Sequence, residues 1–198
     1  MRKTASILSL IAVIALLGAA VAFGGDAPAE KHQFVGASKC KMCHKKAEDG
    51  EQYVIWEKSK HANAYAVLAG DKAKEIASAK GIENPQEADA CLKCHVTGHG
   101  APAELLGTKY DKTEGVGCES CHGAGGDYYK KSTMVSILTG EIDGATVGLR
   151  MPDEKTCKGC HNEESPTFTS FDFKEMSKKI AHPIPDAKKA EYKTPAGG

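Results

Sequence analysis

Four copies of one short motif contain all eight cysteines of the chain. Each copy reads Cys-x-x-Cys-His, and the copies occupy residues 40–44, 91–95, 118–122 and 157–161. Two thiols three positions apart with an imidazole directly after them are typical of c-type haem attachment. In such a site both sulfurs bond covalently to the haem, and the histidine binds the iron from one side. The sequence therefore predicts four covalently attached haem c groups.

The predicted roles divide the motif residues into two sets. The sulfurs that hold haem are those of Cys40, Cys43, Cys91, Cys94, Cys118, Cys121, Cys157 and Cys160. The proximal iron ligands are His44, His95, His122 and His161. Zinc ribbons and disulfide frameworks also use paired cysteines, but neither needs a histidine after every second cysteine. We therefore favour haem attachment over both.

A helix suits this motif, because residues i and i+3 of a helix lie on one face and both sulfurs then point to one edge of the haem. We expect Ser38, Asp89 and Asp153 to cap the helices that carry the first, second and fourth motifs. Glycines surround the third motif, which permits close approach of the backbone to a haem. A phosphate-binding loop is the other use of such a run, but no Lys-Ser/Thr pair follows it.

The histidines outside the motifs are candidate distal ligands, on the opposite side of the irons: His32, His61, His99 and His182. We expect an amphipathic helix over residues 51–69 that places His61 on its apolar face, so we favour iron ligation over a buried core histidine. His182 follows the last expected helix, which Asp172 is expected to cap and which runs to about residue 181. We favour a ligand role for His182 over a surface histidine.

The other two spare histidines keep two interpretations each. His99 follows His95 by four residues, and such a link spans at most about 14 Å. That is tight for a path to the opposite face of the same haem, so His99 is either a loop histidine or a ligand of a neighbouring haem. His32 is either solvated or a ligand supplied from the segment before the first motif.

The chain begins with a pattern that is typical of an export signal. Arg2 and Lys3 precede an apolar run over residues 7–17, and Ala-Val-Ala at 20–22 offers a cleavage site. An uncleaved membrane anchor is the alternative. Because c-type haem is attached outside the bacterial cytoplasmic membrane, the motifs agree with a periplasmic or otherwise exported protein.

Four segments follow from these patterns. We expect a signal peptide over 1–22, a flexible lead-in over 23–37, a tetrahaem cytochrome c domain over 38–184 and a disordered tail over 185–198.

The composition favours a fold built around bound groups rather than around a large apolar core. Aromatic residues make up only 6% of the chain, and small cores need other staples such as cofactors. We expect a mainly α fold with little β, in which short helices and long loops wrap around four haems. The 26 basic and 26 acidic side chains balance and no basic cluster occurs, which excludes nucleic acid as a partner.

Several of these residues together resemble the tetrahaem cytochrome c554 family of multihaem c-type cytochromes. They are the first motif with Lys45, then Trp56, Lys60-His61-Ala62, the second motif, and residues 115–123, which read Gly-Val-Gly-Cys-Glu-Ser-Cys-His-Gly. The likeness is sharpest over residues 36–126. It implies a mostly helical fold, closely stacked haem pairs and electron carriage in the periplasm.

The resemblance also implies particular ligand pairs. It places His61 on the third haem, opposite His122, and His182 on the first haem, opposite His44. It further implies that the second haem, on His95, is five-coordinate.

This chain departs from the family pattern after the third motif. The family has a histidine there that binds the fourth haem, but residues 123–130 contain none. Either His99, His32, a methionine or a lysine replaces it, or the fourth iron is open as well.

Bis-histidine ligation leaves no open iron site and suits electron transfer. We therefore expect an electron carrier that shuttles electrons through closely spaced haems between redox partner proteins, bound by transient docking. One alternative is a small nitrogen-oxide or hydroxylamine redox enzyme with an open iron, although the sequence offers no acid–base constellation for it. Another is a subunit of an extracellular cytochrome filament, which would require self-association. After signal cleavage we expect no stable membrane insertion.

Overall fold

The computed structural model describes residues 31–182 and 184–189, so the predicted signal peptide, most of the lead-in and most of the tail lie outside the described residues. Within them the chain forms short helices and turns without a strand, apart from one isolated bridge between Phe34 and Leu106. The predicted mainly α fold is therefore confirmed. No helix of this part is long and apolar enough to cross a membrane. The α-helices are α1 (Ala37–His44), α2 (Gln52–Glu57), α3 (Asp71–Ala79), α4 (Asp89–His95), α5 (Cys118–His122), α6 (Lys131–Leu138), α7 (Glu154–Lys158), α8 (Phe173–Ile180) and α9 (Asp186–Lys189).

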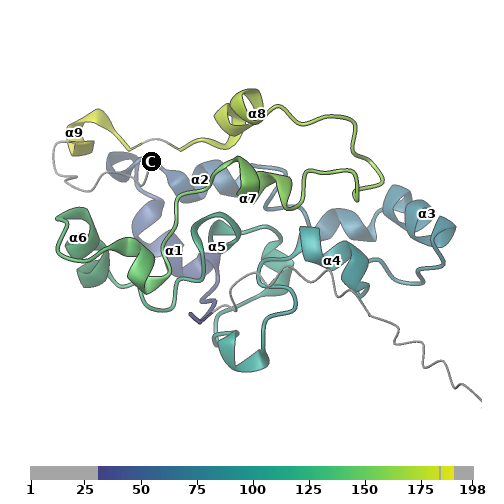
Figure 1. Cartoon of the computed structure of the whole chain (residues 1–198), viewed down its shortest axis with the longest axis horizontal. Coiled ribbons are helices and arrows are strands. Elements are labelled where there is room, and N and C mark those ends of the chain that lie inside the picture. The colour runs from purple at the N-terminus through teal and green to yellow at the C-terminus, as the bar shows by residue number, and fades with distance from the viewer. Residues whose placement is uncertain (1–30, 183, 190–198) are drawn as a thin grey trace, which may run out of the picture.

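Three of the four helices that carry the motifs occupy the middle of an elongated molecule, and α4 lies towards one end. Figure 1 shows α1, α2, α5 and α7 in the central part, α3 and α4 towards one end, and α6 and α9 towards the other. The first, second and third motifs lie entirely within α1, α4 and α5. The fourth begins in α7 and continues into the turn that follows. Each motif therefore starts on a helix, as its spacing predicts.

The long helix expected over residues 51–69 is wrong. The structure has the six-residue α2, then turns, then a 3-10 segment at Ala66–Ala69. His61 lies in the turns between them, and its carbonyl oxygen accepts a hydrogen bond from the backbone N–H of Val116 at 3.0 Å. A carbonyl that pairs with a distant segment does not continue a helical ladder. The expected burial of one side of this segment is confirmed in part, because Ala64 and Leu68 are buried.

Two of the four expected helix caps are confirmed. Asp153 accepts a hydrogen bond from the backbone N–H of Thr156 at 2.7 Å and caps α7. Asp172 accepts one from the N–H of Glu175 at 3.0 Å and caps α8. Both aspartates lie three residues before the amide that they bind, which is the spacing of a local cap.

The other two caps are wrong. Neither Ser38 nor Asp89 is an N-cap, because each lies inside its helix and makes no capping bond. The cap position of α1 is Gly36, whose φ of 86° suits glycine. The first amides of α1 bind carboxylates from a distant part of the chain.

The lead-in and the tail also differ from expectation where they are described. Phe34, Val35 and Ala37 are buried, so the end of the predicted flexible lead-in belongs to the packed core. The predicted disordered tail includes α9. The rest of both segments lies outside the described residues.

A small apolar cluster supports the second motif. Leu68 packs with Leu92 and Val96, which flank the second half of this motif, and Tyr65 and Tyr110 pack against the cluster. The cluster holds α4 against the 3-10 segment that follows His61.

Candidate haem attachment sites

The third-motif segment, residues 115–123, receives hydrogen bonds from distant parts of the chain. The first come from the region of α2. The indole Nε1 of Trp56 donates to the carbonyl oxygen of Val116 at 2.8 Å, and the N–H of Val116 donates to the carbonyl of His61. Trp56 is 9% exposed. The bond from Val116 fixes the backbone of His61 beside the third motif, and the indole of Trp56 holds Val116 in place.

Thr97 joins the second motif to the same segment. It is 7% exposed and lies two residues after His95. Its Oγ1 accepts a hydrogen bond from the N–H of Gly117 at 2.7 Å and donates to the carbonyl of Gly115 at 2.9 Å. The same hydroxyl lies 2.8 Å from Oγ of Ser120.

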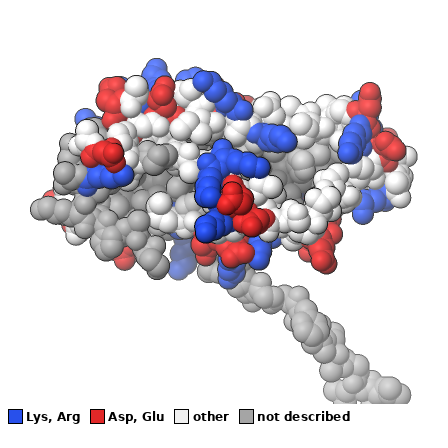
Figure 2. Space-filling view, turned by 90° about the horizontal axis from the view of Figure 1, so that it is seen from above, with Lys and Arg blue, Asp and Glu red and all other residues white. Residues whose placement is uncertain are grey.

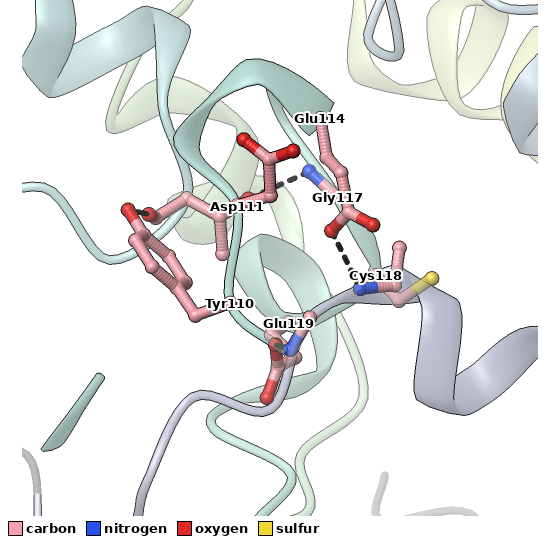
Figure 3. A pocket seen from close by; sticks show the side chains of 9 residues that line it. Tyr110, Asp111, Glu114, Gly117, Cys118 and Glu119 are labelled. Atoms are coloured by element: carbon pink, nitrogen blue, oxygen red, sulfur yellow. Dashed lines mark hydrogen bonds between the residues drawn. The ribbon is translucent and has the colours of Figure 1, made fainter. Parts of the chain in front are cut away.

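Two glutamates join the first motif to the third-motif segment. Glu119, inside the third motif, accepts hydrogen bonds from the N–H groups of Val35 at 2.8 Å and Gly36 at 2.9 Å. Glu114, just before the segment, accepts from the N–H groups of Ala37 at 2.7 Å and Ser38 at 3.3 Å. Figure 3 shows both carboxylates beside the backbone that leads into α1. Four consecutive amides at the start of α1 are thus held by two side chains from the third-motif region.

The end of the third motif contacts the chain that leads to the fourth. The N–H of Arg150 donates to the carbonyl of His122 at 3.0 Å. Gly123 lies so close to the carbonyl oxygen of Gly148 that a side chain has no room there. The hydroxyl of Tyr128 donates to the carbonyl of Gly123 at 2.7 Å.

Four of the eight motif thiols meet in two pairs. All eight are free, and Cys40 of the first motif is hydrogen-bonded to Cys118 of the third. That bond, together with burial, raises the pKa of Cys40. Cys160 of the fourth motif is bonded in the same way to Cys94 of the second, and burial with the neighbouring thiol raises the pKa of Cys160 to about 12. The first motif thus lies beside the third, and the second beside the fourth.

Three motif imidazoles are oriented by hydrogen bonds at Nδ1. The acceptors are Oε1 of Gln52 for His44 at 3.3 Å, and the carbonyl of Ala64 for His95 at 2.6 Å. For His122 the acceptor is the carbonyl of Arg150, at 3.2 Å. An imidazole that donates from Nδ1 keeps its Nε2 lone pair for a metal. With two free thiols beside each imidazole, these residues fit covalently bound haem.

Two of the spare histidines lie against motif histidines. The ring centres of His61 and His161 are 5.9 Å apart, and those of His122 and His182 are 5.7 Å apart. Two imidazoles on opposite sides of one metal, with metal–nitrogen bonds of about 2 Å, would have ring centres roughly 6 Å apart. Burial lowers the pKa of both His61 and His182, which favours the neutral form that binds metal.

These contacts differ from the pairs that the resemblance implied. His61 faces the motif histidine of the fourth site, His161, rather than His122. His182 faces His122, with His44 close enough to act on the pKa of both. The difference fits the missing histidine after the third motif, because it gives the fourth motif a partner imidazole.

The remaining two spare histidines are each bound to an aspartate. Nδ1 of His32 is 2.6 Å from Oδ2 of Asp127, and the ring lies against the backbone of Gly148. Nε2 of His99 is 3.1 Å from Oδ1 of Asp89, the residue that was expected to cap α4. Because Nε2 of His99 is engaged there, the structure favours a loop role for His99.

Sequence reasoning missed Glu114, Glu119 and Thr97. Apart from Gly125, six residues after Glu119, their partners lie 18 to 84 residues away in the sequence, so local patterns do not identify them. One signal was present: Glu119 is a charged residue inside a motif that must be buried on one side. It is 2% exposed.

In residues 31–182 and 184–189, paired thiols followed by oriented imidazoles lie on short helices without a sheet, which is the arrangement of a c-type cytochrome. A family model described as cytochrome c554 and c-prime matches residues 39–123. A curated protein, cytochrome c-554 of Nitrosomonas europaea, is 31% identical over 148 residues, which are 69% of this chain and 61% of that protein. No solved structure matches the chain. The chain belongs to the cytochrome c554 family, and it spans about three fifths of the length of this curated relative.

Proposed function

We propose that the protein is an exported tetrahaem cytochrome that carries electrons between redox partners. The observation that carries this proposal is the convergence of the motifs: the first thiols of motifs one and three touch, as do the second thiols of motifs two and four. Haem c, when bound at each motif, supplies one-electron exchange between ferric and ferrous iron. A chain of attachment sites in contact is what an electron carrier needs, because transfer is between neighbours.

Seven of the eight histidines have a role in this proposal. His44, His95, His122 and His161 hold the irons from the proximal side. His61 is the distal ligand of the iron on His161, and His182 that of the iron on His122, because these rings lie at the separation that a shared iron requires. His32, oriented by Asp127, is the remaining candidate for a distal ligand.

The surface supports brief encounters with partners. Figure 2 shows basic and acidic side chains interspersed over the face that it presents, without a wide field of one sign. Weak redox complexes bury small areas and do not need strong complementarity. We further propose that residues 1–22 direct export to the periplasm and that residues 38–184 form the haem-binding domain, now with residues 34–37 packed into it.

Mass spectrometry of the mature protein tests the proposal directly. The expected result is a chain that begins after residue 22 and carries four covalent haems. Fewer haems would contradict the tetrahaem assignment.

Absorption and electron paramagnetic resonance spectra then separate a carrier from an enzyme. For a carrier, low-spin iron is expected at His122 and His161, the two motif histidines to which the proposal gives a distal imidazole. An open, high-spin iron that binds hydroxylamine or nitric oxide would favour the enzyme instead, and polymers in size-exclusion chromatography would favour the filament.

A further inference from the structure

We infer that Glu119 is a fixed, buried negative charge that lowers the reduction potentials of the haems on the first and third motifs. The inference rests on the proposed haem attachment and deepens it, because it assigns one side chain to the control of two sites. Glu119 touches neither iron ligand and is therefore a positioning and tuning residue.

The hydrogen bonds of Glu119 indicate an ionised carboxylate. Oε1 accepts from the N–H groups of Val35 at 2.8 Å and Gly125 at 2.7 Å, and Oε2 accepts from the N–H of Gly36 at 2.9 Å. All three partners are donors, and a carboxylate is the form that only accepts. Three amide donors are sufficient to hold such a charge away from water.

The charge has no cationic partner. Within the described residues no lysine or arginine side chain forms an ion pair with Glu119, and its side chain is almost fully buried. The adjacent cavity has a volume of about 10 Å³, room for a single water, and Glu114, Tyr110 and Thr97 also line it. The groups that line this cavity are thus neutral or acidic, and bulk water does not screen the field of Glu119.

The field acts on the place where two haems would be attached. Glu119 is the neighbour of Cys118, which touches Cys40. After the hydrogen bond with Cys118 and burial, the charges of Glu119 and Glu114 also raise the pKa of Cys40, which means that they oppose added negative charge at that point. By the same electrostatics they favour ferric over ferrous iron there, since reduction removes one positive charge.

Glu114 offers a matched comparison. It binds two amides of α1, as Glu119 binds two amides just before α1, but Glu114 is only partly buried. A purely mechanical role predicts similar effects when either carboxylate is replaced by an amide. An electrostatic role predicts a larger effect at Glu119, because a less screened charge acts more strongly.

Potentiometric titration of the four-haem protein, followed by optical and paramagnetic resonance spectra, tests the inference. Glu119→Gln should shift the electron equilibrium towards reduction of two haems by about tenfold, which is about 59 mV for one electron. The other two haems should shift less. Glu114→Gln should shift the same two haems by about threefold or less.

Unchanged potentials in Glu119→Gln, with the full haem count, would overturn the inference and leave the proposed function intact. Equal shifts in both variants would also overturn it, in favour of a mechanical role. If Glu119→Gln yields no mature protein, Glu119→Asp decides, because it keeps the charge and disturbs the hydrogen bonds. Wild-type potentials in Glu119→Asp support the inference, and a tenfold shift refutes it.

Discussion

Gly123, directly after the third proximal histidine, is the position where the smallest substitution should do the most damage. Its φ of 81° and ψ of 164° lie in a region that essentially only glycine adopts, and a side chain there costs about 1–3 kcal/mol in backbone strain. An added Cβ would also overlap the carbonyl oxygen of Gly148, so backbone must move. Overpacking of this kind costs about 1–3 kcal/mol more. Gly123→Ala should therefore lose about 4 kcal/mol of stability.

Gly140 supplies the control, because its φ of 78° is similar while nothing lies within 4 Å of a Cβ built on it. Gly140→Ala should lose only the strain, about 1–2 kcal/mol. Denaturant unfolding of the two holoproteins, followed by Soret absorbance and circular dichroism, measures the difference. Gly123→Ala should also displace His122, so its Soret spectrum should change before unfolding. Equal losses in the two variants would refute the argument that contact with Gly148 sets the cost.

Three further predictions concern the site and its supports. His61→Ala should convert one haem from low to high spin, and identical spectra for this variant and wild type would remove His61 from the ligand set. The control His99→Ala loses only a contact with Asp89 and should leave the paramagnetic resonance spectrum unchanged. Trp56→Phe should lower stability by about 1–3 kcal/mol because the carbonyl of Val116 loses its donor, and Tyr53→Phe, which keeps the ring contact with Trp56, should lower the denaturation midpoint less. Burial raises the pKa of Glu114 above 4.5, so its contribution to stability is fully present below pH 4.5 and is lost as pH rises through the raised pKa. Glu114→Gln should flatten the dependence of the denaturation midpoint on pH across that window, and an unchanged slope would contradict this expectation.

Local patterns predicted local structure well. The Cys-x-x-Cys-His spacing placed each motif on a helix, and Asp153 and Asp172 cap the helices that follow them, because partners three residues apart meet without help from the rest of the chain. The amphipathic pattern over residues 51–69 predicted which side of the segment is buried. It did not predict where the helix ends, because that depends on a hydrogen bond between His61 and Val116, 55 residues later.

The histidine pairs and the start of α1 could not be predicted for the same reason, because their contacts join distant parts of the chain. Serine is a common helix cap, and Ser38 lies near the start of α1. The amides there bind the carboxylates of Glu114 and Glu119 instead, and both glutamates lie more than 70 residues away in the chain. A single sequence also could not show which motif His61 approaches, since its separation from each motif permits several folds. The structure resolves that choice through the contact of His61 with His161.

The third-motif segment is joined by hydrogen bonds to several distant parts of the chain. Between Gly115 and Gly123 nearly every residue makes a long-range bond: to Thr97, to Trp56 and the backbone of His61, to the start of α1, and to Arg150. A substitution here moves three motifs at once.

The fourth motif is built differently, because Asp153 caps its helix locally and its link to the segment passes through Arg150 and Gly148. Its position relative to the others can therefore change at lower cost. The proposed use of His61 opposite His161 is the kind of variation that such an arrangement permits. The first and second motifs are joined to the third-motif region by side-chain hydrogen bonds, so a change in their positions would break these bonds.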